Sequence, residues 1–149
     1  MRDRFLALWE RAARGELDGW RSTPLAALAL VVVLDQTPRN MFRGEARAFA
    51  TDSRALAAAE SAVERGFDRV LLPHERTFVY LPFEHAEDVA AQRRSLELFR
   101  AGDPENLEWA KRHHDVVARF GRFPHRNATL GRKSTPEEIE FLGQPGSSF

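Results

Sequence analysis

The sequence predicts an all-α protein made of antiparallel helix pairs. Apolar residues recur at spacings of three and four along most of the chain, and no stretch alternates with the period of two that a half-buried strand shows. Proline after a hydroxyl or acidic residue marks where helices begin, and glycine or a further proline marks where they end. The six or seven helices obtained in this way have short connectors, which place sequence neighbours antiparallel.

The first half of the chain contains four predicted helices. Residues 3–14 carry a helical apolar stripe that ends before a glycine, which suits a C-terminal cap. The second helix begins at Pro24, and we expect it to end near Gln36, because the residue before Pro38 is pushed out of the α region. An alanine-rich helix follows over residues 51–66, and a short aromatic helix over residues 73–82 is expected to stop at its own proline.

Three further helices are predicted in the second half. The fifth covers residues 86–100, and the sixth begins at the cap-and-proline pair 103–104 and reaches about Phe120. The segment from Thr135 to Glu138 has the form of a capping box with proline at the first helical position, and it opens a last helix to residue 142. We expect residues 1–149 to form a single domain with a loosely held tail over residues 143–149.

Composition narrows the function classes. The 22 basic and 22 acidic residues cancel, which argues against a broad nucleic-acid surface. The absence of cysteine removes disulfides, thiolate zinc sites and a cysteine nucleophile. The longest apolar run, residues 25–34, is about half of what a bilayer span requires, and residues 1–4 lead into no apolar segment of the kind that a secretory signal has. We therefore expect a cytoplasmic protein with no membrane partner.

Polar residues occupy the apolar faces of several predicted helices. In the sixth helix His113 falls near the middle of the buried half and His114 near its edge, and Gln92 lies on the buried stripe of the fifth. Asp35 continues one face of the second helix, which is otherwise apolar all round. Because a buried polar group without a partner costs about 1–3 kcal/mol, we expect one connected polar cluster at one end of this central helix. The arginine that Asp35 needs is one of four in the two polar loops, namely Arg39, Arg43, Arg122 and Arg126.

The loop from Phe120 to Ser134 is the segment densest in polar groups, and two interpretations of it stay open. Its arginines can satisfy the last carbonyls of neighbouring helices and pair with acidic groups such as Asp35 or Glu84, which is a structural role. Alternatively, they form an anion pocket together with the helix N-terminus that begins at residues 135–136.

The candidate ligand-binding pocket collects the side chains that these arguments direct inward. They are Asp35, Gln36, Arg39, Asn40, Arg43, His85, Gln92, His114, Arg122, His125, Arg126 and Asn127. We expect no metal, because the adjacent His113 and His114 diverge by about 100° on a helix and no His-Glu-x-x-His pair occurs. We expect no cofactor, because the sequence has no phosphate-cradling glycine loop and no dinucleotide fingerprint. No catalytic residue is assigned.

Three motifs in this order resemble a bacterial family known as domain of unknown function 924, and they are the segments Leu34–Gly44, Leu81–Asp88 and Phe120–Asn127. The similarity extends from about Phe5 to Phe149. It implies a tetratricopeptide-like α-α superhelix and no established activity. Members of the family usually carry a further aromatic-rich segment before the position of Arg4, and this sequence starts without it. The resemblance thus implies apolar surface that is exposed or is covered by a second copy in a homodimer.

These observations favour a helical binding or scaffold domain over an enzyme. The interior pocket, rich in arginine and histidine, is expected to hold a small anion or an acidic group of a partner such as an acidic peptide. One alternative is a hydrolase that uses histidine and carboxylate groups. The other is a purely structural polar cluster, with peptides bound on the concave face of the superhelix.

Overall fold

The computed structural model describes residues 2–149, and the prediction of an all-α fold is confirmed. Seven α-helices follow one another in the described part of the chain, and no strand occurs there. They are α1 (Arg2–Ala13), α2 (Pro24–Met41), α3 (Asp52–Glu64), α4 (Pro73–His85), α5 (Val89–Gly102), α6 (Leu107–Phe120) and α7 (Pro136–Leu142). Short 3-10 turns lie between them, namely η1 (Asp18–Ser22), η2 (Ala46–Phe49), η3 (Phe67–Arg69), η4 (Pro104–Asn106) and η5 (Pro124–Arg126).

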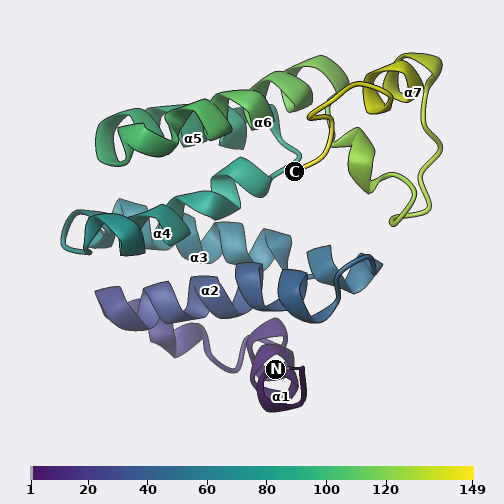
Figure 1. The fold of residues 1–149 in the computed structure, drawn as a ribbon. Helices are drawn as coiled ribbons and strands as arrows, with labels where there is room; N and C mark the ends of the chain where they lie inside the picture. Colours follow the sequence, from purple (N-terminus) through teal and green to yellow (C-terminus); the bar gives the residue numbers. More distant parts are fainter. Residues whose placement is uncertain (1) are drawn as a thin grey trace.

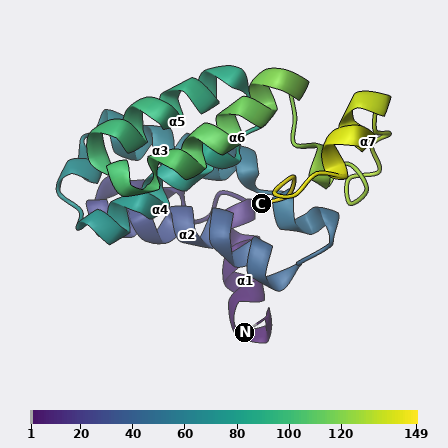
Figure 2. The ribbon, with the colours of Figure 1, turned by 45° about the horizontal axis from the view of Figure 1, so that its top comes forward.

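Helices that are consecutive in the sequence pack against each other, so the fold is a stack that follows the chain. Figure 1 shows α1 at one side of this stack and α5 with α6 at the other, with α2, α3 and α4 between them. Helix α2 is central, because it contacts α1, α3 and α4. Figure 2 shows α7 beside the end of α6, apart from the other helices. None of the helices in residues 2–149 is long and apolar enough to cross a membrane.

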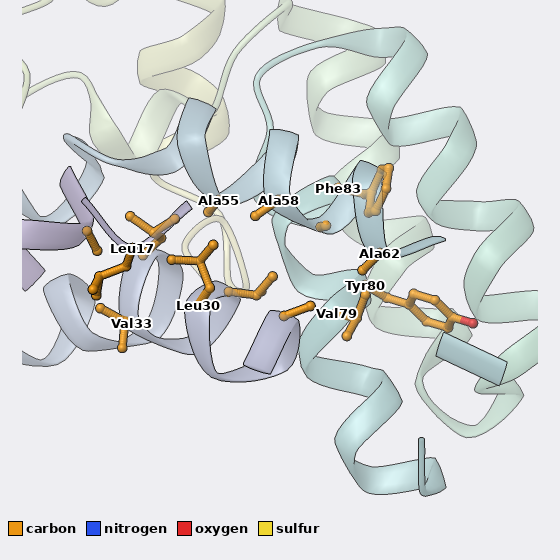
Figure 3. Close-up of a cluster of buried hydrophobic side chains, with 14 of the residues drawn as sticks. Leu17, Leu30, Val33, Ala55, Ala58, Ala62, Val79, Tyr80 and Phe83 are labelled. Atoms are coloured by element: carbon orange, nitrogen blue, oxygen red, sulfur yellow. The ribbon is translucent and has the colours of Figure 1, made fainter. Parts of the chain in front are cut away.

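The main core lies where α2, α3 and α4 meet (Figure 3). Leu30 and Val31 of α2 are fully buried, as the apolar run predicts. Helix α3 presents alanines to them, of which Ala55 and Ala58 have no exposed surface. Small side chains at helical spacing let α3 approach α2 closely, and each large apolar side chain that this packing buries contributes roughly 1.5–3 kcal/mol.

The prediction that α2 ends near Gln36 is wrong, since the helix continues through Pro38 to Met41. Proline has no N–H, so Pro38 leaves the carbonyl of Leu34 without its helical donor. The hydroxyl of the buried Thr51 supplies that donor at 2.6 Å and in turn accepts a hydrogen bond from Trp9 Nε1 at 3.0 Å. A side chain from outside the helix thus offsets the defect that would otherwise end it.

Three other boundaries also differ from the prediction. Helix α4 continues past Pro82 to His85, because burial of the Phe83 ring against the rest of the stack outweighs the local cost of proline. Helix α5 begins later than predicted, after Asp88, whose carboxylate accepts a hydrogen bond from Ala91 N at 2.8 Å. Helix α6 begins at Leu107 after the turn η4.

Residues 143–149, which we expected to be loosely held, fold back onto α6. The ring of Phe149 stacks on His113 with their centroids 4.0 Å apart. Arg112 donates to the carbonyl of Gly146 at 3.4 Å, and Ser147 donates to the carbonyl of Leu142 at 3.1 Å. The tail therefore covers part of the surface next to the candidate site.

Candidate functional site

A cavity of about 660 Å³ lies between the end of α2, the end of α4, the middle of α6 and the turn η5. Its volume is within the range of pockets that hold small organic ligands. Charged and aromatic side chains share the wall, and the lining residues are Gln36, Arg39, Arg43, Gly44, Ala48, Phe49, Leu81, Glu84, His85, Trp109, His113, His125, Arg126, Thr129 and Phe149.

The structure divides the predicted pocket residues into two groups. Those that line the cavity are Gln36, Arg39, Arg43, His85, His125 and Arg126, and Asp35 lies directly behind them, bonded to His85. The others lie elsewhere. Asn40 is exposed and donates to the carbonyl of Gln36, and His114 pairs with Asp115. Gln92 is fully buried and donates to the carbonyls of Glu84 and Ala86, while Arg122 and Asn127 belong to a second cluster.

Asp35 anchors the wall formed by α2 and α4. It is only 1% exposed, and its carboxylate accepts from Gln36 Nε2 at 2.6 Å, lies 2.8 Å from His85 Nδ1 and lies 3.2 Å from Arg39 Nη1. Burial opposes ionisation of Asp35, but His85, Arg39 and Gln36 together lower its pKa to about 2. Because Asp35 is an acceptor at neutral pH, His85 donates through Nδ1, which leaves its Nε2 for another partner.

Arg126 is a buried cation with an incomplete set of partners. Its Nη2 donates to the carbonyl of His85 at 3.0 Å, while Asp52 Oδ2 lies 3.5 Å from its Nη1. The guanidinium is stacked between the rings of Phe49 and Phe123, at 4.5 and 4.6 Å from their centroids. Its buried Nε has no hydrogen-bond partner among the described residues. Burial lowers the pKa of Arg126 to about 10, so Asp52 neutralises its charge only in part.

Asp52 is mainly committed to another arginine. Arg39 donates to both of its oxygens, at 2.7 and 3.0 Å, which is the bidentate geometry of a strong pair. At the rim, Arg43 is exposed and forms no ion pair within residues 2–149. His125 also lines the cavity, and its buried Nδ1 has no partner in the described chain. Burial and the neighbouring Arg126 lower the pKa of His125 to about 4, so its imidazole is neutral at pH 7.

The pocket prediction omitted a second acid–histidine pair on the cavity wall. Glu84 Oε1 lies 3.2 Å from His113 Nδ1, which is also 2.8 Å from the carbonyl of Trp109. Burial, with the charges of Asp35 and Asp103, raises the pKa of Glu84 to about 7. Burial lowers that of His113 to about 4. The helical wheel carried the signal for His113, because it placed this residue nearer the centre of the buried half than His114.

The second cluster fastens the loop after α6. Arg132 donates to both oxygens of Glu87, at 2.7 and 2.8 Å, and to Asn127 Oδ1 at 2.9 Å. Asn127 donates in turn to Glu138 at 2.6 Å, and Arg122 donates to both oxygens of that carboxylate. These groups satisfy one another's hydrogen bonds. They connect the loop that carries η5, and with it Arg126, to Glu87 before α5 and to Glu138 of α7.

Within residues 2–149 no group of three or more histidine and acidic side chains has the arrangement of a metal site.

Comparison with known proteins identifies the family. Residues 1–146 match the family described as "Bacterial protein of unknown function (DUF924)". The chain belongs to this family. A solved structure of similar fold is that of the protein of unknown function ATU0120 from Agrobacterium tumefaciens, with 49% identity and a TM-score of 0.90 over 95% of this chain and 80% of that chain. No curated protein matches. The family therefore accounts for the fold of this DUF924 protein and assigns it no activity.

Proposed function

We propose that the cavity binds a small anionic ligand, either a free molecule or an acidic group of a partner. The observation that carries the proposal is Arg126, a buried cation whose Nε lacks a partner and whose nearest carboxylate is already held by Arg39. A buried charge without full compensation is costly, and an anion in the cavity, which Arg126 lines, would add to that compensation. The guanidinium fork suits carboxylate and phosphate groups alike.

The charge balance of the cavity supports an anion. Asp35 and Asp52 are acceptors for Arg39 and His85, so their charge is already engaged. Glu84 is largely protonated below pH 7 because its pKa is raised. Among the described residues that line the cavity, Arg126 and the rim residue Arg43 are the cations that keep N–H groups without an acceptor.

The test is the shift in melting temperature, Tm, that anions produce at matched ionic strength. Sulfate, phosphate and acetate should raise the Tm of the wild type, because a ligand at about 100 times its Kd stabilises the folded state by roughly 2.7 kcal/mol. Arg126→Met keeps an apolar chain between Phe49 and Phe123 and should abolish the shift. Arg119→Met is the matched control, since Arg119 is an exposed arginine outside the cavity. An equal shift in all three proteins would contradict the proposal.

A second candidate is a hydrolase-type enzyme that acts on the bound anion. It is favoured by two acid–histidine pairs on one cavity wall, Asp35 with His85 and Glu84 with His113, whose imidazole centroids are 6.3 Å apart. A carboxylate on Nδ1 orients an imidazole so that Nε2 can accept a proton from a nucleophile such as water. Turnover of a panel of chromogenic esters and phosphate esters that His85→Gln removes would support this candidate. Turnover that survives the change would exclude it.

The third candidate is the tetratricopeptide-like scaffold that binds peptides on a concave face. The stacking of consecutive helices supports it, since such stacks form superhelices. Acidic peptides in the same Tm assay separate it from the anion pocket. Peptide binding that is unchanged in Arg126→Met would favour a surface groove over the cavity.

A further inference from the structure

We propose that the ligand is an aromatic carboxylate, with its ring in the place now taken by the ring of Phe149. This inference rests on the proposed anion site and names the class of molecule that the site accepts. The observation behind it is that one end of the cavity already holds a benzyl group, supplied by the chain itself.

The place of the Phe149 ring is a slot built from three other rings. His113 stacks on it at 4.0 Å with an interplanar angle of 28°. Phe123 and His125 meet it edge-on, with centroids at 5.9 and 5.6 Å and interplanar angles of 72° and 70°. Stacked and edge-on contacts at these separations are the favourable arrangements of aromatic pairs. The geometry is thus specific for a flat ring and offers little to an inorganic anion.

The ring slot is continuous with the anion site. Phe123 contacts the Phe149 ring and also lies under the guanidinium of Arg126, so one side chain is a common wall for both. His125 connects them as well, because it contacts the Phe149 ring and is the sequence neighbour of Arg126 on η5. A molecule with a ring in the slot and a carboxylate a few bonds away can reach the edge of the Arg126 guanidinium that borders the cavity.

The contact that Phe149 makes is exchangeable. Its side chain remains 40% exposed. Two side-chain hydrogen bonds hold the tail before it, from Arg112 to the carbonyl of Gly146 and from Ser147 to the carbonyl of Leu142. The tail can therefore leave without disturbing the main core, which lies among α2, α3 and α4. We infer that Phe149 competes with the ligand ring for the slot and lowers its affinity.

The experiment measures binding of benzoate, phenylacetate, 3-phenylpropionate and 4-phenylbutyrate by calorimetry, with hexanoate as the non-aromatic carboxylate. One member of the phenyl series should bind at least tenfold tighter than hexanoate. The number of methylene groups in the tightest binder indicates the distance between the ring slot and the guanidinium of Arg126. Phe149→Ala should tighten that binding about tenfold by removing the competitor. Phe5→Ala is the matched control, because Phe5 is similarly exposed at 37% but lies on α1 outside the cavity.

The outcomes separate this inference from the proposed function. If sulfate raises the Tm through Arg126 but no phenyl carboxylate binds tighter than hexanoate, the anion site stands and the ring slot is refuted. If phenyl carboxylates bind equally well to Arg126→Met, the slot stands and the anion site is refuted. If Phe149→Ala and Phe5→Ala have the same effect on affinity, competition by the tail is refuted.

Discussion

Replacement of Glu84 by glutamine should stabilise the protein at alkaline pH and leave its stability unchanged near pH 4. Glu84 is 4% exposed, and its pKa is raised from 4.5 to about 7 by burial and by the charges of Asp35 and Asp103. Below pH 4.5 it is protonated in both the folded and the unfolded protein. Between pH 4.5 and 7 the folded protein keeps a proton that the unfolded chain has released, so the free energy of unfolding falls as pH rises.

The size of the effect follows from the same two pKa values. The decrease in the free energy of unfolding is complete above pH 7. It amounts to about 3 kcal/mol, since each unit of difference between the folded and unfolded pKa corresponds to roughly 1.4 kcal/mol. Glutamine has the shape of glutamic acid without the ionisation, so Glu84→Gln does not suffer this loss. His113 and His125, whose pKa values are lowered to about 4, add a rise in stability between pH 4 and 6.5, and this rise occurs in both proteins.

The assay is urea unfolding of both proteins at intervals from pH 4 to pH 8.5. Glu87→Gln is the matched control, because Arg132 and the Phe123 N–H overcome the effect of burial and lower the pKa of Glu87. That variant should be less stable than wild type at neutral pH, with a difference that shrinks on acidification. A Glu84→Gln difference that is constant with pH, or that has the sign of the Glu87 control, would refute the reasoning.

The same carboxyl group should control anion binding. Above pH 7 the charge on Glu84 shares the cavity with the bound anion, so the Tm shift produced by sulfate should decrease between pH 6 and pH 8. In Glu84→Gln the shift should stay constant over that interval. A parallel decrease in both proteins would assign the pH dependence to another group.

Two further predictions concern the scaffold around the site. A Cβ at Gly102 would lie 2.9 Å from Tyr80 Cε2, so Gly102→Ala should lower the free energy of unfolding by about 1–3 kcal/mol, and Gly102→Ala with Tyr80→Leu should cost less than the two single changes together. Strict additivity in urea unfolding would contradict that contact. Thr51→Val should cost about 1–3 kcal/mol because it leaves the carbonyl of Leu34 without a donor, and the cost should be smaller in a Pro38→Ala background, where the backbone N–H returns. An equal cost in both backgrounds would show that the hydroxyl does not serve this role.

Local sequence signals predicted some helix ends correctly. They were wrong where a side chain distant in the sequence supplied a hydrogen bond. Thr135 caps α7 by accepting from Glu138 N, as the capping motif predicts. The reciprocal half of that motif is absent, because the Glu138 side chain bonds to Arg122 and Asn127 instead. The local rule for proline was wrong at Pro38. It predicts that the helix ends before this residue, but α2 continues to Met41. The compensating hydroxyl of Thr51 is 17 residues from Leu34, beyond the reach of any local rule.

By itself, the sequence determined the helices and the directions of their faces. Periodicity requires only neighbours three and four residues apart, so it placed Asp35, Gln92 and His113 inside before any packing was known. Only the tertiary structure decided the partners. Of the four arginines available to Asp35, Arg39 lies one turn along the same helix and pairs with it, whereas Arg126 is left partly unpaired beside the cavity. Such choices depend on distances across the stack, and the spacing of residues along a chain does not contain them.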